Sequence, residues 1–150
     1  MRTRSKAREF AMQVLFVCDF HDDWKHDCIA DTFTSFEFSD SAHDYAMELA
    51  CGVAMAIDEI DAAISLASTN WSISRMGRVD RAVLRLATFE LLHCPDVPKN
   101  VVLNEAIELA KKFGCNESSV FVNGVLDSLA NPGRTERHEV LDCQSKREAA

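Results

Sequence analysis

The residues with the clearest capacity for chemistry lie in one stretch near the carboxyl end, KKFGCNESSVFVNG (residues 111–124). Its two lysines, Lys111 and Lys112, offer cations to phosphate groups. Ser118 and Ser119 stand where a helix would begin, and the free backbone N–H groups of a helix start attract anions. Phe121 offers a ring for base stacking, which is worth on the order of 1–3 kcal/mol per base. The stretch therefore predicts a site for single-stranded nucleic acid, with Asn123 close by.

Phe121 and Gly124 occupy unusual places on the helix expected there. With Val122 at the centre of the buried face, Phe121 lies about 100° away and Val120 about 160° away, which predicts an exposed Val120. Gly124 lies in mid-helix, where glycine costs about 1 kcal/mol relative to alanine. Two interpretations remain open. Either the ring faces a ligand beside a glycine that permits close approach, or both residues serve helix packing at the edge of the core.

Two further groups of cations occur elsewhere in the chain. The first eight residues contain no acid and four basic residues, Arg2, Arg4, Lys6 and Arg8. They could form a phosphate-binding arm, whose affinity would depend on salt, or a solvated chain end. A second group shares one stripe of a helix expected near the middle of the chain: Arg78, Arg81 and Arg85. Solvation or pairing with nearby acids is the favoured interpretation of that stripe.

Helices must position all of these residues, because the chain has helical hydrophobic spacing, lacks strict alternation and contains only three prolines and five glycines. We expect helices over residues 4–20, 28–36, 41–68, 79–93, 98–113 and 116–130. The helix at 79–93 is apolar nearly all round, which predicts a central position. Pro98 suits a first helical turn, Gly114 suits a helix end, and Asn116 is the expected cap of the last helix.

The first helix carries two apolar stripes. One stripe contains five residues, Phe10, Ala11, Val14, Leu15 and Cys18. The other contains Met12, Phe16 and Phe20, spaced by four residues. Such a helix is either buried on both sides or leaves its second stripe for a partner protein.

The composition bounds the class of protein. A chain of 150 residues with 47% hydrophobic and 27% charged residues suits one globular domain, expected at 1–133, followed by a charged and disordered tail at 134–150. The net charge is −8, but residues 19–61 alone carry −11, so a basic face remains available elsewhere. The six cysteines form no CxxC pair, and no catalytic motif, metal-ligand spacing or transmembrane run occurs. We expect a cytoplasmic, non-enzymatic protein without a cofactor or metal.

Four segments together resemble one family. RSKAREFAMQVLF, DRAVLRLATFELL, VPKNVVLNEAIELAKKFG and FVNGVLDSLA are similar, in order and spacing, to segments of the NusB transcription antitermination factors. The resemblance covers about residues 4–130, is weak over 21–60 and is absent from the tail. It implies an all-α fold of about six or seven helices in two packed helical subdomains.

The resemblance also implies a function and its partners. NusB proteins bind the boxA element of nascent RNA, notably ribosomal RNA leaders, together with NusE, a small-subunit ribosomal protein in a second role. The pair helps to assemble a termination-resistant RNA polymerase complex. The implied RNA-binding positions are Arg2, Arg4, Lys6, Arg8, Lys111, Lys112, Ser118, Ser119, Phe121 and Asn123. The implied NusE-facing positions are Phe16, Phe20 and Asp80.

Other interpretations stay open at this point. The same helical fold could serve as a protein-interaction module with little RNA affinity, which the net charge and Val120 favour. Val120 stands where many family members have a basic residue. An RNA-modifying enzyme is disfavoured because the chain has no room for a catalytic domain. The sequence does not decide between a monomer and a homodimer.

Overall fold

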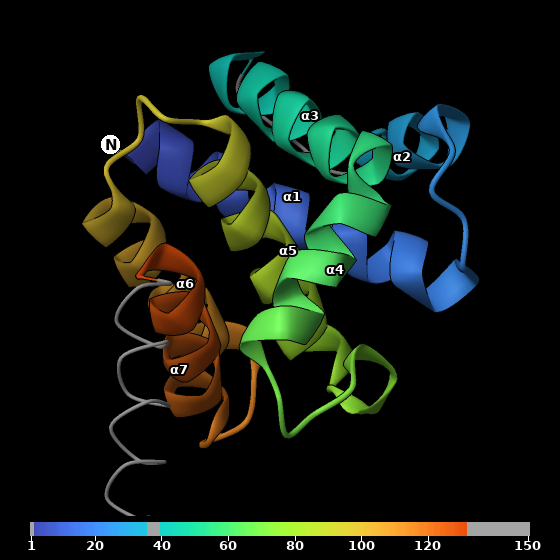
Figure 1. Ribbon diagram of the computed structural model, residues 1–150. Helices are drawn as coiled ribbons and strands as arrows, with labels where there is room; N and C mark the ends of the chain where they lie inside the picture. Colours follow the sequence, from blue (N-terminus) through green and yellow to red (C-terminus); the bar gives the residue numbers. More distant parts are fainter. Residues whose placement is uncertain (1, 36–39, 132–150) are drawn as a thin grey trace, which may run out of the picture.

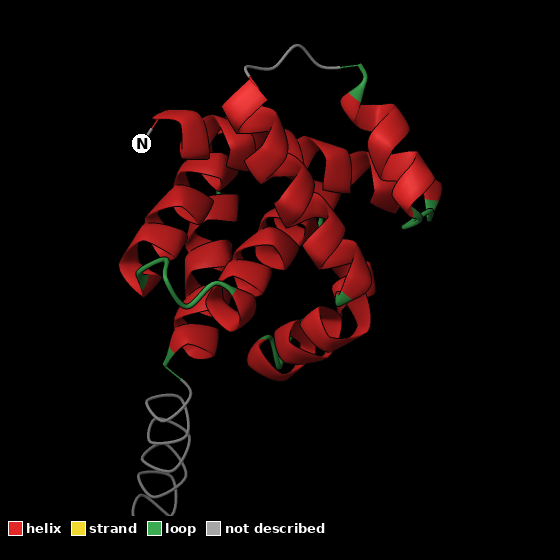
Figure 2. Cartoon of the chain, turned by 90° about the horizontal axis from the view of Figure 1, so that it is seen from above, coloured by secondary structure: helices red, strands yellow, loops and turns green. Residues whose placement is uncertain are grey.

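Seven α-helices and one short 3₁₀ helix, and no strand, make up the part of the chain that the structure describes (Figures 1 and 2). The computed structural model describes residues 2–35 and 40–131; the side chain of Arg2 and the tail at 134–150 lie outside the described residues. The helices are α1 (Arg2–His21), α2 (His26–Phe33), α3 (Asp40–Met55), α4 (Ile57–Ala67), α5 (Arg78–His93), α6 (Lys99–Phe113) and α7 (Ser118–Ala130), with the 3₁₀ helix η1 at Ile73–Arg75. The predicted all-α fold is confirmed.

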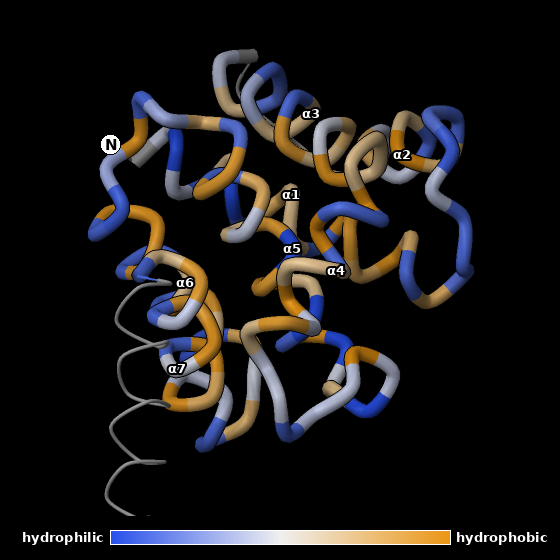
Figure 3. The backbone as a smooth tube through the Cα atoms, in the orientation of Figure 1, coloured by the Kyte–Doolittle hydropathy of each residue, from blue (hydrophilic) through white to orange (hydrophobic). Residues whose placement is uncertain are grey.

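Helix α5 lies at the centre of the molecule and contacts α1, α3, α4, α6 and α7 (Figure 1). Every residue from 82 to 88 is buried, as the apolar circumference of this helix predicted. The helices α1, α2 and α3 pack on one another, and α4, α6 and α7 pack around the other side of α5. These are the two subdomains that the resemblance implied. Along each helix the hydropathy changes repeatedly from hydrophobic to hydrophilic (Figure 3), as partly buried helices require.

The single helix expected over residues 41–68 is wrong, because the structure divides it into α3 and α4. The break lies at Ala56, whose φ of −109° and ψ of 21° are not helical. Helix α3 packs on α1 and α2, whereas α4 turns away to pack on α5 and α7. Neither proline nor glycine marks the break, so tertiary packing decides it. Gly52, one turn earlier, lets α3 approach the Phe89 ring so closely that a Cβ atom there would overlap it.

The helix ends around α6 agree in part with the expectations. Pro98 precedes the first residue of α6, and Gly114 follows the last. The expected cap at Asn116 is wrong: Glu117 is the residue before α7, and it makes no side-chain capping hydrogen bond. The Ser118 hydroxyl instead accepts a hydrogen bond from the Cys115 backbone N–H, over 3.0 Å. The side chain of Ser118, the first residue of α7, therefore orders the turn before this helix, a role that was expected of Asn116.

A buried ion pair joins the first helix to the central one. The Arg8 guanidinium donates to both carboxylate oxygens of Glu90 at 2.9–3.1 Å, and the two side chains are 4% and 2% exposed. Glu105 of α6 lies 3.7 Å from the same guanidinium, which also lies 5.8 Å from the centroid of the Tyr45 ring of α3. Burial alone would lower the pKa of Arg8, but the hydrogen bond and the charge of Glu90 outweigh it and raise that pKa above its ordinary value.

No helix in the described ranges is both long enough and apolar enough to cross a membrane. Among those same residues, no three histidine, cysteine or acidic side chains come together in a way that could hold a metal ion.

Replacing Arg8 should destabilise the fold strongly. Arg8→Met leaves the Glu90 carboxylate buried without its partner, and breaking a buried pair in this way costs about 3–5 kcal/mol in the free energy of unfolding. Urea denaturation followed by circular dichroism measures the change. The matched control is Lys6→Met, since Lys6 is 59% exposed and its pair with Glu9 spans 3.9 Å. The double variant Arg8→Met with Glu90→Leu should recover much of the loss; equal stability of Arg8→Met and wild type would contradict the assignment.

Candidate nucleic-acid interface

The turn between α6 and α7 is held in one close arrangement. Gly114 takes an extended backbone conformation, with φ of −93° and ψ of −173°. A left-handed turn is therefore not the reason for a glycine at this position. A Cβ atom at this position would lie 2.6 Å from the Ser118 Cβ and 2.7 Å from the Ala110 carbonyl oxygen. Glycine is therefore required by close approach. The buried Ser118 side chain fills the space that Gly114 leaves, and this contact fixes where α7 begins.

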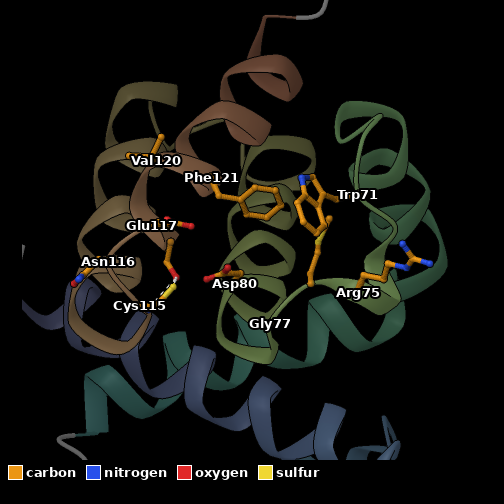
Figure 4. A pocket seen from close by; sticks show the side chains of 11 residues that line it. Trp71, Arg75, Gly77, Asp80, Cys115, Asn116, Glu117, Val120 and Phe121 are labelled. Carbon is orange, nitrogen blue, oxygen red and sulfur yellow. Dashed lines mark hydrogen bonds between the residues drawn. The ribbon is translucent and has the colours of Figure 1, made fainter.

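A pocket of about 510 Å³ opens beside this turn (Figure 4). Its aromatic walls are Phe121 of α7 and Trp71 of the loop after α4, whose ring centroids lie 6.4 Å apart at an interplanar angle of 79°. Figure 4 shows the two rings approaching from opposite sides, with Asp80 of α5 beneath them. Trp71 is 55% exposed and Phe121 is half-buried, so both rings keep surface for a ligand.

The charged groups that line the pocket are the guanidinium of Arg75 and two carboxylates without partners. Among the described residues, neither Asp80 nor Glu117 makes an ion pair or hydrogen bond through its side chain. Asp80 is half-buried and Glu117 is exposed. Val120 at the rim is 75% exposed, which confirms the prediction for its side chain. The pocket therefore offers both hydrogen-bond acceptors and a cation beside its aromatic walls.

Exposed lysines of α1 and α6 come together around Glu9. The Lys112 ammonium lies 3.0 Å from the Glu9 carboxylate, and the Lys6 ammonium lies 3.9 Å from it. The two lysine side chains are 56% and 59% exposed, so Glu9 neutralises them only in part. Lys111, at 60% exposure, has a neighbouring acid in Glu108. The structure thus brings cations from both predicted groups to one place, directly before the turn that leads into α7.

Not all of the predicted RNA-binding side chains are available. Arg8 is buried against Glu90, and the Ser118 hydroxyl is used within the turn, so their side chains support the interface rather than contact a ligand. Arg4 is exposed, with its guanidinium 5.1 Å from the centroid of the Tyr45 ring. Ser119 is half-buried and Asn123 is exposed. Beside Asn123, a Cβ atom on Gly124 would meet nothing within 4 Å, so tight helix packing does not explain that glycine.

The arginine stripe of α5 pairs mainly with acids, as favoured from the sequence. Arg81 binds the Asp19 carboxylate at 2.6 Å, and Arg85 binds Asp61 at 2.9 Å and lies 3.4 Å from Asp19. These ion pairs neutralise part of the acidic charge of residues 19–61. Burial disfavours a charged Arg85, but the hydrogen bond and charge of Asp61 raise its pKa above the ordinary value. The arginines Arg81 and Arg85 are therefore structural in this molecule.

The second stripe of α1 runs from the core to the surface. Met12 is buried, Phe16 is half-buried, and Phe20 is 60% exposed. The exposed Arg78 guanidinium lies 5.2 Å from the centroid of the Phe20 ring. Both interpretations of this helix therefore apply to different parts of it. Around Met12 the helix is buried on both sides, and at its carboxyl-terminal end the Phe20 ring is exposed.

Trp71 and Met76 line the pocket but were not predicted as functional residues. The sequence presents them in a polar connector, NWSISRMG, without helical periodicity. An exposed tryptophan in a connector is the one signal that could have identified this side of the pocket, because aromatic residues are enriched at binding surfaces.

The cysteine thiols of the described residues should differ in reactivity. The hydrogen bond from Ser118, whose oxygen lies 3.4 Å from the sulfur, lowers the pKa of the exposed Cys115 thiol. Burial raises the pKa of Cys18 to about 12. Because the thiolate is the reactive form, iodoacetamide at pH 7.5 (about one unit below an ordinary thiol pKa) should label Cys115 well before Cys18. Mass spectrometry of tryptic peptides measures the rates, and Ser118→Ala should slow labelling at Cys115. Equal rates at Cys115 and Cys18 would contradict this geometry.

Comparison with known proteins places the chain in a family. A model of the NusB family matches residues 5–131. The transcription antitermination protein NusB of Geobacter sp. (strain M21) is 44% identical over 141 residues, covering 87% of this chain and 96% of that protein. The structure of T. maritima NusB has a TM-score of 0.77 at 35% identity, covering 85% and 90% of the two chains. A crystal structure of the antitermination factors NusB and NusE in complex with dsRNA has a TM-score of 0.77 at 30% identity, covering 88% and 98%. By sequence and by fold, this chain belongs to the NusB family.

Proposed function

We propose that this protein is a transcription antitermination factor that binds boxA-type single-stranded RNA together with a NusE partner. The observation that carries the proposal is the convergence of Lys6 and Lys112 on Glu9, beside the turn that presents Phe121. Cations from α1 and from the end of α6 thus lie next to the turn that leads into the helix of Phe121. Membership of the NusB family supports the same function.

The protein acts by binding and not by catalysis in this proposal. Lys6, Lys111, Lys112 and Arg4 hold phosphates, and Phe121 stacks on a base. RNA bound at this face and NusE bound at another part of the surface hold each other in place, because the second contact becomes intramolecular. The joint complex then associates with RNA polymerase transcribing in the cytoplasm and makes it resist termination.

The NusE-facing surface in this proposal begins at Phe20. Its ring is 60% exposed, and Phe16 lies half-buried one turn before it. Arg78, against the Phe20 ring, joins this surface to the start of α5, where Asp80 lies two residues later. Asp80 also lines the pocket beside Phe121, so the proposed partner surface and this pocket share the start of α5.

A protein-interaction module without useful RNA affinity is the second candidate. The exposed apolar side chains of Phe20 and Val120 favour it, since apolar surface of this kind often marks protein contacts. The exposed cations around Glu9 favour RNA. The first experiment below separates the two candidates.

Phe121→Ala should weaken RNA binding, whereas Phe20→Ala should weaken only the contribution of NusE. Loss of one stacking ring corresponds to about 1–3 kcal/mol, or roughly five- to 150-fold in Kd. Fluorescence anisotropy with a labelled boxA-type RNA, with and without NusE, measures both effects. Phe20→Ala is the matched control, because it removes the same ring from a different surface.

A scrambled RNA of the same composition tests sequence selectivity. Selective binding that tightens with NusE and weakens in Phe121→Ala supports the antitermination function. Absence of selective binding even with NusE would favour the protein-interaction module, and Phe121 would then be a peripheral core residue.

Gly124→Ala should raise the stability of the protein and weaken its binding to RNA. Alanine suits a helix interior better than glycine by about 1 kcal/mol, and its Cβ meets nothing in this structure, so the variant should be more stable. RNA that passes close to the backbone of α7 would meet the new methyl group and bind more weakly. Thermal denaturation and RNA anisotropy on the same preparation check both effects. Higher stability with unchanged affinity would show that RNA does not approach this part of α7.

A further inference from the structure

Glu9 is an acid among the cations of the proposed RNA-binding surface. Its two carboxylate oxygens accept hydrogen bonds from the Lys112 ammonium at 3.0 and 3.1 Å, and the Lys6 ammonium lies 3.9 Å from one of them. Lys6 precedes Glu9 by about one turn of α1, whereas Lys112 belongs to the last turn of α6. One carboxylate therefore bridges cations from two helices, which is the arrangement in which two ammonium groups would share one phosphate.

The contact of Glu9 with Lys112 differs from the contact of Glu108 with Lys111 on the same surface. The Glu9 side chain is 18% exposed and lies 3.0 Å from its lysine, whereas the Glu108 side chain is 73% exposed and lies 3.8 Å from its lysine. Water and salt screen a charge pair less when one partner is withdrawn from solvent. Glu9 therefore holds Lys112 more firmly than Glu108 holds Lys111.

The fold does not depend on the contacts of Glu9. Another acid, Glu105 of α6, already joins α1 to α6, because its carboxylate accepts a hydrogen bond from the Ser5 hydroxyl at 2.6 Å and lies 3.7 Å from the Arg8 guanidinium. The side chains of Lys6 and Lys112 are more than half exposed, and ion pairs with such exposed partners contribute little to stability. An acid at position 9 therefore acts mainly on what the two lysines can bind.

We propose that the Glu9 carboxylate takes the place of an RNA phosphate in the free protein and competes with RNA for Lys6 and Lys112. This inference rests on the RNA-binding function proposed above and adds an intramolecular competitor to it. A backbone phosphate displaces the carboxylate from Lys112 when RNA binds, and the charge of Glu9 then repels that phosphate. Because phosphates carry no sequence information, Glu9 lowers the affinity for every RNA. Stable binding then requires the further contacts of Phe121 and NusE.

Glu9→Gln in the full chain tests the competition, because it removes the charge and keeps the size of the side chain. At about 50 mM salt the variant should bind boxA-type RNA and scrambled RNA about fivefold more tightly than wild type, since a charge contact at the surface is worth up to roughly that factor. The slope of log K against log salt should become steeper by about 0.7, because one more phosphate is neutralised. Fluorescence anisotropy over a series of salt concentrations measures both effects.

Two controls separate the local contact from net charge. Asp58→Asn also removes one negative charge, but Asp58 is exposed on α4 and makes no ion pair among the described residues, so its Kd should equal that of wild type. In a Lys112→Gln background, Glu9→Gln should give a smaller gain, because the contact that it relieves is already absent. Circular dichroism checks that Glu9→Gln keeps the helical content and thermal stability of wild type.

Weaker RNA binding by Glu9→Gln would overturn the inference and make Glu9 a positioning residue for the two lysines. An unchanged Kd at low salt, or an equal gain in Asp58→Asn, would overturn it as well. In each of these cases, selective binding that depends on Phe121 would leave the proposed function intact. Absence of selective RNA binding in wild type and in every variant, even with NusE, would instead overturn the proposed function together with this inference.

Discussion

The buried pair of Arg8 and Glu90 is the interaction on which the arrangement of the helices depends. It joins α1 to α5, and through Tyr45 and Glu105 it also touches α3 and α6. A charged guanidinium in the interior is stable only if its partners are fixed around it. The pair therefore specifies how the two subdomains meet. It also explains why an arginine in a basic amino-terminal segment is unavailable to RNA while its neighbours Lys6 and Arg4 are exposed.

Much of the fold could be predicted because the decisive signals are local. The apolar circumference of α5, Pro98 and Gly114 each identify their elements from a few residues. The break at Ala56 could not be predicted, since it arises from the different partners of α3 and α4 and leaves no breaker in the sequence. The same holds within the site. The sequence identifies Lys111, Lys112 and Phe121, but whether an arginine or serine side chain faces solvent depends on neighbours that are distant in the chain.

The candidate interface combines two kinds of surface that would conflict if they were mixed. Ammonium groups gather on the side of α1 and α6, and carboxylates without partners face a pocket with aromatic walls. A chain with net charge −8 can present such a basic side because its acidic residues are concentrated in one segment, residues 19–61, which alone carries −11. The total charge is thus a poor guide to what this surface binds. The position of each charge relative to its partners decides it.

The contacts of Ser5 with Glu105 and of Lys112 with Glu9 join residues about a hundred positions apart. Contacts of such long sequence separation form late in folding, because the entropy of closing the loop must be overcome first. On the ribosome, the first helix emerges long before α6 exists. The basic surface is therefore incomplete until nearly the whole domain has been synthesised. A nascent or truncated chain would carry the amino-terminal cations but would lack α6, which holds them in a fixed position beside Lys112. The ability to recognise RNA is therefore coupled to completion of the fold.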